Sequence, residues 1–553
     1  MSQVTIEQAF QHAFEHHRAG RLQEAEGIYR QIVAAQPDHF NAIHLLGALA
    51  FQVGALQEAG ELLQRAMRLN PAAAEPYYHF GCVLQAQNKF SEAITYYRLA
   101  IARNAAYAEA WNNLGNSMKE LGEIPDAIAA FRKRVEIDPA NWSAQSNLLL
   151  TLWYDARLSS DEIVAEHRRW NESHAAGLVS AEPFDNDKRS DRRLRIGYVS
   201  PDFRRHPVTS FLEPLLANHD HTQAEVFCYS HPLHVDEVTA RLRGHADHWR
   251  EIAALTDEQI AAMIRQDRID VLVDLAGHTA GNRLGIFARK PAPVQVSYLG
   301  YIGTTGMTAM DYRVADGQTD PLGVEKWYTE KLVRLPRSFA CYQPPPHAPE
   351  VGVLPAAANG YITFASFNAL GKITNEALGL WAAILGALPD SRLVMSAVGL
   401  QDPAAQRRIR DFFATRGIPV DRLEFLGFAP MPQYLALHQR IDILLDTFPV
   451  NGHTITCHAL WMGVPAVTLA GKSYASRLGA SVLTNLGLTD LVASSSEEYV
   501  LKALRLAGNA VRMKELRQTL RDRMANSALM NAAQFSRDLE DAYREMWRQW
   551  CAR

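Results

Sequence analysis

The sequence has few cysteines, and none of them has a metal-binding spacing. The five cysteines among 553 residues are widely scattered, and no two form a CxxC pair. This argues against a structural zinc site and against a disulfide framework. The chain also has no excess of basic charge, since 56 Lys and Arg oppose 60 Asp and Glu. Nucleic-acid binding depends on many basic contacts to phosphates, so we expect no nucleic-acid partner.

Long apolar runs are missing as well. No stretch reaches the roughly 18 apolar residues that a membrane-spanning helix needs, so we expect no membrane association. The first residues, MSQVTIEQAFQHAFEHH, are polar and amphipathic and have no apolar core followed by a cleavage site. Scattered cysteines fit a reducing compartment. We therefore expect a cytoplasmic protein.

Three familiar ligand-binding motifs are absent or misplaced. No GxGxxG occurs, which argues against a dinucleotide fingerprint. Gly471-Lys472-Ser473 resembles the end of a phosphate-binding loop, but the earlier glycine of that motif is replaced by Ala466. Asp185-Asn186-Asp187 matches a DxD metal signature, yet it lies in a charged segment and not directly after a buried strand. We expect a solvated linker there and no metal site.

Small and bulky residues recur every 34 positions in the first quarter of the chain. The repeated alanines are Ala25, Ala59, Ala93 and Ala127, and the bulky residues four positions later are Tyr29, Leu63, Tyr97 and Phe131. Gly47, Gly81 and Gly115 precede the last three alanines by 12 positions. Pro37, Pro71 and Pro139 follow the alanines at the same distance, whereas Ala105 fills the remaining position. This pattern predicts tetratricopeptide helix pairs, and we place the repeat superhelix at residues 1–177.

The concave face of such a superhelix usually binds peptide. Asn113 and Asn147 are 34 residues apart, so their amides are candidates to hold an extended peptide backbone. The earlier repeats have Leu45 and His79 at the same position. The equal alternative is that Asn113 and Asn147 are polar residues on the surface that bind no peptide.

From residue 193 the pattern changes to an α/β alternation. Residues 178–192 are charged, without apolar periodicity, and we take them as a linker. Apolar runs typical of buried parallel strands then follow at 193–200, 225–230, 270–277, 293–300, 361–367, 392–398, 422–428, 441–447 and 465–471. A segment rich in proline, alanine and glycine, 341–360, separates the two series. We predict two doubly wound lobes, 193–345 and 360–553, the second ending in an amphipathic helix that braces the first lobe or forms an oligomer contact.

Two loops of the second lobe suggest an anion site. In the segment 446–465, Asn451-Gly452 predicts a turn and a helix should begin near His453, with Thr454 and Thr456 as hydroxyl donors. A helix N-terminus suits a diphosphate. Lys372 lies in the loop after the first strand of this lobe, where its ammonium would neutralise phosphate. Helix capping by Thr454 and a surface role for Lys372 are the alternatives.

With these features together, the chain resembles the O-GlcNAc transferase and SPINDLY family of tetratricopeptide-containing inverting glycosyltransferases. The resemblance rests on the repeats and on IGYVSPDFRRHPV (196–208), LAGHTAGNRLGIFARKPAPVQVSYLGYIGTTGM (275–307), FNALGK (367–372) and LLDTFPVNGHTITCHALWMGVP (444–465). The short segment between the lobes suggests a bacterial-type member. The resemblance implies a two-lobed fold of the GT-B type that needs no metal or other cofactor. It also implies transfer of N-acetylglucosamine from UDP-GlcNAc to Ser or Thr of a protein acceptor. SPINDLY members transfer fucose from GDP-fucose, which is one alternative, and a scaffold with weak or no turnover is another.

The resemblance also assigns donor-site residues in the second lobe. It implies that Lys372 contacts the β-phosphate and that His453 and Thr454 hold the diphosphate, while Ile455 replaces the family's second threonine. Ala369 replaces a glutamine near the phosphates. The remaining implied positions are the uracil edge at Ala429, Pro430 and Met431, the base-stacking position at Tyr434, and His458 in place of a ribose-binding aspartate.

In the first lobe, His206 matches a histidine proposed as a base or positioning group in the family. Asp202, four residues earlier, would orient its ring, and a surface histidine is the alternative. His278 matches a functional tyrosine, and His167 loosely matches another proposed catalytic histidine. Leu299, Gly300 and Tyr301 are expected to line the sugar and acceptor pocket, because glycine allows a close backbone approach.

Overall fold

The computed structural model describes residues 5–553, so the first four residues of the expected repeat region lie outside it. The chain forms two compact units. One contains the residues up to Pro139 together with Val398–Arg408, and the other contains Ala140–Ala397 and Ile409–Arg553.

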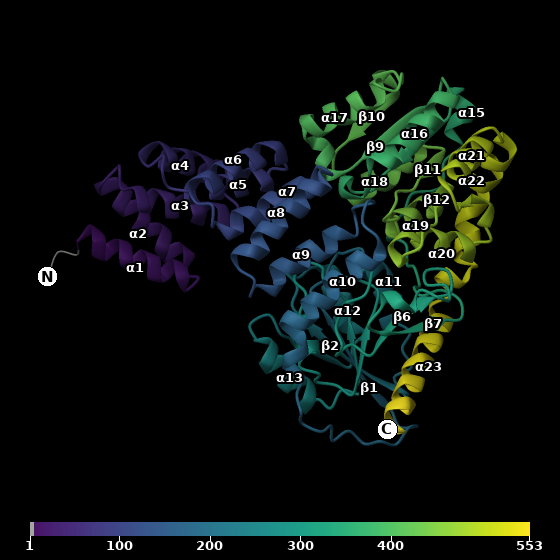
Figure 1. The fold of residues 1–553 in the computed structure, drawn as a ribbon, viewed down its shortest axis with the longest axis horizontal. Helices are drawn as coiled ribbons and strands as arrows, with labels where there is room; N and C mark the ends of the chain where they lie inside the picture. Colours follow the sequence, from purple (N-terminus) through teal and green to yellow (C-terminus); the bar gives the residue numbers. More distant parts are fainter. Residues whose placement is uncertain (1–4) are drawn as a thin grey trace. The chain divides into compact units, whose positions relative to one another are not determined.

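The first unit is built from helix pairs (Figure 1). Its helices are α1 (Ile6–Arg18), α2 (Leu22–Ala35), α3 (Phe40–Gln52), α4 (Leu56–Leu69), α5 (Glu75–Ala86), α6 (Phe90–Arg103), α7 (Ala108–Glu120) and α8 (Ile124–Ile137). All four repeated alanines and all four bulky residues have no exposed surface. The tetratricopeptide prediction is therefore confirmed for these pairs.

Repeated glycines let the two helices of a pair approach closely. A Cβ added at Gly81 of α5 would lie 2.6 Å from the Tyr97 ring of α6, and one added at Gly115 would lie 2.7 Å from Phe131. Real Cβ atoms do not come that close, so each bulky ring occupies the space that a glycine leaves open. The 34-residue pattern thus encodes the contact inside each pair.

Two further helices, α9 (Trp142–Leu152) and α10 (Ser160–Trp170), belong to the second unit. A Cβ at Gly285 would lie 2.2 Å from the Trp142 ring, and one at Gly303 would lie 2.2 Å from Trp153. These close contacts attach α9 to the α/β region, and a Cβ at Gly306 would lie 2.3 Å from the His167 carbonyl oxygen of α10. The compact repeat unit therefore ends at Pro139, whereas we expected it to extend to residue 177.

The expected linker, 178–192, has no helix or strand beyond Leu178, but part of it is anchored. The Asn186 amide donates to the Asp270 carboxylate at 2.8 Å, and Arg192 pairs with the same carboxylate at 2.6 Å. Asp185 and Asp187 remain exposed beside Arg268 and Arg189. The DxD match is thus an ion-paired surface segment.

The first lobe contains a seven-stranded parallel sheet in the order β3-β2-β1-β4-β5-β6-β7. Its strands are β1 (Leu194–Ser200), β2 (Ala224–Ser230), β3 (His248–Glu251), β4 (Val271–Asp274), β5 (Val294–Ser297), β6 (Tyr312–Asp316) and β7 (Lys331–Leu335). Its helices are α11 (Thr209–Leu216), α12 (Glu237–Gly244), α13 (Asp257–Gln266) and α14 (Leu284–Ala288). Ile196 of β1 pairs with Val226 and Val271 on its two sides, which fixes the register at the sheet centre.

The second lobe has a six-stranded parallel sheet in the order β10-β9-β8-β11-β12-β13. Its strands are β8 (Thr363–Ser366), β9 (Arg392–Ser396), β10 (Leu423–Leu426), β11 (Ile443–Leu445), β12 (Ala466–Leu469) and β13 (Val492–Ala493). Its helices are α15 (Pro355–Asn359), α16 (Asn375–Ala387), α17 (Pro403–Ala414), α18 (Met431–Leu437), α19 (Thr454–Trp461), α20 (Leu478–Asn485), α21 (Ser496–Ala507), α22 (Ala510–Ala525) and α23 (Ala532–Cys551). The strand order reverses between β8 and β11, and ligands of doubly wound sheets bind at such a point.

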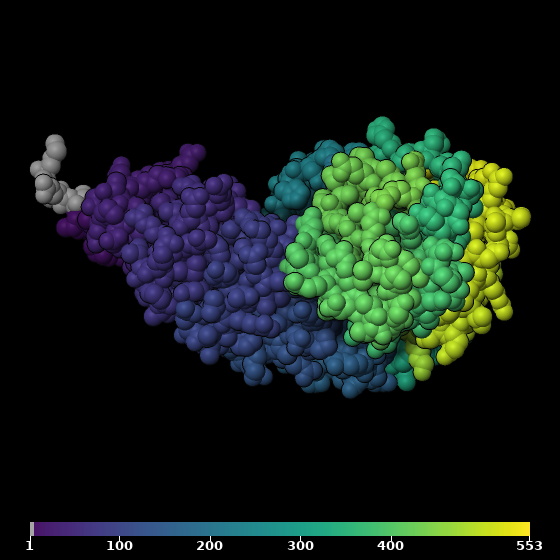
Figure 2. Space-filling model, turned by 90° about the horizontal axis from the view of Figure 1, so that it is seen from above, coloured from purple at the N-terminus to yellow at the C-terminus, as the bar shows by residue number. Residues whose placement is uncertain are grey.

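Helix α23 returns to the first lobe and lies along β7 (Figure 1). Its Glu540 carboxylate bonds to the His219 ring at 2.6 Å, and Gln549 accepts from the Tyr312 hydroxyl at 3.1 Å. The space-filling view shows the C-terminal helices as a yellow surface beside the green second lobe (Figure 2). The predicted brace is confirmed. Among residues 5–553, no helix is both long and apolar enough to cross a bilayer.

The glycine contacts give a first prediction. Gly81→Ala should lower the free energy of unfolding by about 1–3 kcal/mol relative to Gly60→Ala, because the new methyl group would overlap the Tyr97 ring. Gly60 is a matched helical control, since its Cβ would meet Phe80 at an ordinary 3.6 Å. Urea unfolding of the full chain, followed by circular dichroism, measures the difference. Equal stability of the two variants would contradict the proposed packing.

Candidate active site

Lys372 and the start of α19 converge at the switch point of the second lobe. Lys372 ends the 3-10 turn Leu370–Lys372 after β8, and α19 begins at Thr454 after the loop that follows β11. The Lys372 ammonium donates to the backbone oxygen of Asn451 at 3.1 Å. The two loops singled out in the sequence therefore lie in contact, and their anion binding stays a prediction.

The helix start offers fewer hydroxyl groups than expected. His453 is the N-cap residue of α19, and Thr454 is partly exposed in its first turn. The Thr456 hydroxyl is buried and donates to the Gly452 carbonyl at 2.9 Å. Ile455 packs against the apolar core around Phe367 and Leu444. Thr456 is thus engaged within the protein, and the Thr454 hydroxyl and the free helix N–H groups remain for an anion.

Burial controls the charges around this anion site. Burial lowers the pKa of Lys372, and the carboxylate of Asp446 opposes that shift. Burial, and then repulsion from Lys372, lower the pKa of His453 to about 3. The His453 imidazole is therefore neutral at neutral pH, and the Asp446 carboxylate favours the charged form of Lys372.

His453 also connects the two lobes. Its ring stacks on Phe211 of α11, with centroids 4.1 Å apart, and on Phe339 of the first lobe at 5.1 Å. Its Nε2 atom is buried and has no hydrogen-bond partner among the described residues. The first lobe thus holds this ring from both faces while one nitrogen is left for a ligand.

A cluster of aromatic and polar side chains lies beside the anion site. Tyr434 of α18 contacts Phe367, His438 and His458, with ring centroids 5.8, 5.1 and 5.5 Å away. Burial lowers the pKa of His458 to about 4, which keeps its ring neutral. Ala429, Pro430 and Met431 connect β10 to α18, and the last two are exposed. The structure therefore brings together the residues assigned to the base and the ribose.

Several buried polar atoms in this region have no partner among the described residues. They are the Tyr434 hydroxyl, both ring nitrogens of His458, the His438 Nε2 and both amide atoms of Asn368. Buried polar groups are normally hydrogen-bonded, and such exceptions concentrate at ligand sites. The chemistry of this set suits the hydroxyl and carbonyl groups of a nucleoside.

In the first lobe, His206 lies just before α11. Its Nδ1 is 3.5 Å from a carboxylate oxygen of Asp202, so the expected pairing is present as a long contact. Burial and the nearby Arg204 lower the pKa of His206 to about 4. Burial raises the pKa of Asp202 to about 6, although Arg204 opposes this. A partly exposed, neutral imidazole therefore precedes the helix that contacts His453 through Phe211.

The structure does not support catalytic contact by His278 or His167. The His278 nitrogens bond to the Ser146 hydroxyl at 3.0 Å and to the Thr305 carbonyl at 2.8 Å. His167 bonds to the Ile163 carbonyl and to the Tyr301 hydroxyl, both at 2.7 Å. Both rings are fully buried. Every ring nitrogen already has a partner, so none is left to contact a substrate. The bond from His278 to Ser146 attaches α9 to the first lobe, and the bond from His167 to Tyr301 attaches α10.

Leu299, Gly300 and Tyr301 also differ from expectation. Tyr301 is only 1% exposed and points to His167, so it does not line an open pocket. A Cβ at Gly300 would lie 1.8 Å from the Leu275 carbonyl, so glycine is required by packing after β4 rather than by a ligand. Leu299 has a left-handed backbone, with φ of 68°, and remains partly exposed.

The asparagines proposed for peptide binding belong to different units. The Asn113 amide on α7 donates to the Tyr78 hydroxyl at 3.3 Å and to the Cys82 sulfur at 3.4 Å. Asn147 lies on α9, in the second unit. Asn113 is therefore partly engaged with the preceding repeat, and its peptide role stays a prediction.

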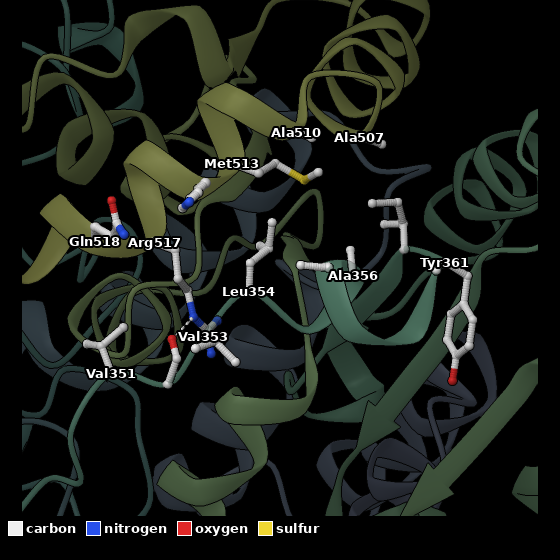
Figure 3. A pocket seen from close by; sticks show the side chains of 15 residues that line it. Val351, Val353, Leu354, Ala356, Tyr361, Ala507, Ala510, Met513, Arg517 and Gln518 are labelled. Carbon is white, nitrogen blue, oxygen red and sulfur yellow. Dashed lines mark hydrogen bonds between the residues drawn. The ribbon is translucent and has the colours of Figure 1, made fainter.

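A cavity of about 670 Å³ is lined by none of the candidate site residues named above (Figure 3). Apolar side chains including Val351, Leu354 and Met513 line it, together with Arg517 of α22. The Arg517 guanidinium donates to the carbonyls of Gly352, His438 and Ile441. This arginine links the segment between the lobes to the turn that carries His438.

Sequence reasoning missed four residues of the site. Asp446 and Asn368 stand inside the quoted motifs but were not singled out, and only their burial beside Lys372 and Gly452 shows their importance. Phe211 and Phe339 have no local signal, because their role depends on contact with a distant ring. Among residues 5–553, no group of three or more His, Cys, Asp or Glu has a metal-binding arrangement.

The buried histidines predict a pH dependence of stability. Burial lowers the pKa of His167 from 6.5 to about 4 and that of His278 well below 6.5. The unfolded chain therefore takes up protons that the folded chain refuses, and the free energy of unfolding should fall as pH drops from about 6.5 to about 4. His167 alone accounts for roughly 3 kcal/mol of this loss. Urea unfolding at several pH values measures it, and His278→Asn should flatten the slope. An unchanged slope in that variant would contradict the assignment.

Comparison with known families agrees with this geometry. The model of glycosyl transferase family 41 matches residues 173–343 and 353–539, and a tetratricopeptide repeat model matches 12–74 and 78–141. The rice (Oryza sativa subsp. japonica) protein named "Probable UDP-N-acetylglucosamine--peptide N-acetylglucosaminyltransferase SPINDLY" is 41% identical over 424 residues, which are 76% of this chain and 46% of the rice protein. The Arabidopsis thaliana protein with the same printed activity and the name SEC is 35% identical over 373 residues, 65% of this chain and 38% of that protein.

This chain spans about half the length of the SPINDLY relatives that it matches. A solved structure is similar over nearly the whole chain: a lysine-to-methionine variant of the Thermobaculum terrenum O-GlcNAc transferase. It shares 38% identity, has a TM-score of 0.81, and the match covers 99% of this chain and 98% of the other. Since both lobes match the family model and the repeats precede them in the expected order, the chain belongs to glycosyl transferase family 41.

Proposed function

We propose that this protein transfers N-acetylglucosamine from UDP-GlcNAc to Ser or Thr hydroxyl groups of a protein acceptor, with inversion at the anomeric carbon. The observation that carries the proposal is the convergence of Lys372 and the start of α19 on one site. The printed activities of the plant relatives and of the solved bacterial relative support the same donor.

The chemistry follows from where charge develops. As the acceptor hydroxyl attacks the anomeric carbon, the bond to the diphosphate breaks and negative charge grows on the departing UDP. The Lys372 ammonium and the free N–H groups of α19 stabilise that charge. These groups supply positive charge that a metal ion provides in other transferases, so the proposal includes a metal-independent reaction.

On the acceptor side, His206 is the proposed base. Its low pKa keeps the ring neutral, so it can accept the hydroxyl proton as the new glycosidic bond forms. The acceptor protein would bind through the tetratricopeptide unit, because such repeats commonly hold extended peptides.

A second candidate is fucose transfer from GDP-fucose. One observation favours keeping it. Tyr434 and His458 depart from the donor-site pattern that the family resemblance implies, and they lie together where a base and ribose would bind.

Substitution of the phosphate-site lysine tests the function. Lys372→Met should lower the rate of transfer by roughly 10²–10³-fold, because one stabilising charge on the leaving group is removed. Lys472→Met is the matched control, since Lys472 is exposed after β12 and should leave the rate unchanged. Transfer of labelled sugar to a peptide library measures both variants. Wild-type turnover by Lys372→Met would exclude the proposed role.

Nucleotide binding distinguishes the two donors and tests metal independence. Titration calorimetry should give tighter binding of UDP than of GDP, and EDTA should change neither UDP affinity nor transfer. Preference for GDP would favour fucose transfer instead. Tight UDP binding with no transfer from any labelled donor would indicate a scaffold, and loss of activity in EDTA would contradict the metal-independent mechanism.

A further inference from the structure

Asp446 is a buried carboxylate, and both of its oxygens accept hydrogen bonds. It follows β11 and has no exposed surface. Its Oδ1 accepts from the backbone N–H groups of Thr447 at 2.9 Å and Gly452 at 2.7 Å. Its Oδ2 accepts from the Thr468 hydroxyl of β12 at 2.7 Å. One side chain therefore closes the whole turn from 447 to 452.

The surroundings of this carboxylate leave no spare space. A Cβ at Gly479 of α20 would lie 2.6 Å from Oδ2, and one at Gly452 would lie 3.2 Å from Oδ1. The same Cβ at Gly452 would lie 2.9 Å from the Asn368 amide oxygen. The turn is thus held in one position, and it ends where α19 exposes its first N–H groups.

The turn and the lysine are joined at Asn451. Lys372 donates to the Asn451 carbonyl at 3.1 Å, and that carbonyl belongs to the turn that Asp446 closes. The titratable groups that face the ammonium are Asp446 and His453, and His453 is neutral. Tyr499 of α21 donates to the Asp446 backbone oxygen at 2.9 Å, and its pKa lies well above 10 because it is buried. Asp446 is therefore the anionic group that acts on Lys372, and the two side chains bond to opposite sides of the Asn451–Gly452 peptide.

Each of the two charges supports the other. Burial alone would favour a neutral amine at Lys372 and a neutral acid at Asp446. Burial raises the pKa of Asp446 to about 6, and Lys372 is among the groups that oppose this rise. Asp446 in turn opposes the fall of the Lys372 pKa. Loss of either charge should move the other group towards its neutral form.

We propose that Asp446 is a positioning residue of the donor site: its carboxylate fixes the 447–452 turn and keeps the Lys372 ammonium charged where a nucleoside diphosphate binds. This inference rests on the proposed function for its ligand, but the charge coupling is a property of the ligand-free protein. Asp446 does not touch the diphosphate. It acts through Lys372, Asn451 and the start of α19.

The decisive variant is Asp446→Asn. Its amide oxygen can still accept from Thr447 and Gly452, and its NH₂ group can donate to the Thr468 hydroxyl, so the turn is kept while the charge is lost. Thr468→Val is the matched control, because it removes one bond to Asp446 and keeps the charge. Unfolding curves of both full-length variants show whether the fold is retained.

The first readout is the pKa of Lys372, followed through the ¹³Cε chemical shift of labelled lysine and assigned with Lys372→Met. Asp446→Asn should lower this pKa by about one unit or more, because a nearby opposite charge has been removed. Thr468→Val should leave it in place. An unchanged Lys372 pKa in Asp446→Asn would overturn the proposal.

The second readout is the pH dependence of UDP binding by calorimetry. Since UDP needs the charged amine, the pH above which affinity falls should move to lower values in Asp446→Asn and stay unchanged in Thr468→Val. A uniform loss of affinity at all pH values would indicate a structural role only and would overturn the charge role. If wild-type protein does not bind UDP, the proposed function fails, and the lysine titration still decides the role of Asp446.

A reciprocal measurement covers the case in which Asp446→Asn does not fold. Lys372→Met should raise the pKa of Asp446, measured from the carboxyl ¹³C shift of labelled aspartate. An Asp446 pKa that is unchanged by loss of the lysine would overturn the coupling.

Discussion

The proposed donor site depends on a single buried contact, the hydrogen bond from the Lys372 ammonium to the Asn451 carbonyl. It joins the loop after β8 to the loop after β11, the two strands between which the sheet order reverses. A cation in this crevice needs polar partners because burial disfavours it. The carbonyl provides one, the charge of Asp446 favours the ammonium form, and the positive end of α19 lies at the same turn.

Contact between the lobes gives this site its other wall. The His453 ring stacks on Phe211 and on Phe339, so aromatic rings of the first lobe hold this residue of the second lobe. Ser481 adds a hydrogen bond to Asp316 at 2.6 Å, and Arg477 donates to the Gln318 carbonyl. Because Phe211 is on the helix that follows His206, the same packing links the segment that carries the candidate base to the second lobe.

The cluster of His167, His278 and Tyr301 shows why motif matching alone misassigns roles. These residues share a family motif or lie near one, and a histidine or tyrosine is chemically able to act in catalysis. Their hydrogen bonds, however, are complete within the protein. They connect α9 and α10 to the first lobe, and this attachment explains why the compact repeat unit ends earlier than the helical pattern.

Local sequence was sufficient for the repeats, for the nine apolar strands and for the position of the two loops that carry Lys372 and His453. Each of these depends on short-range periodicity or on residues next to a strand end. The search for apolar runs missed four strands, β3, β6, β7 and β13. Of these, β3 and β7 are partly exposed and polar, and β13 has only two residues. Only tertiary structure showed that Thr456 bonds to the Gly452 carbonyl just before its helix, that His278 is enclosed and that Asp446 lies across the Asn451–Gly452 peptide from Lys372. Those outcomes depend on burial and on partners far away in the chain, and no local pattern encodes which buried group meets which.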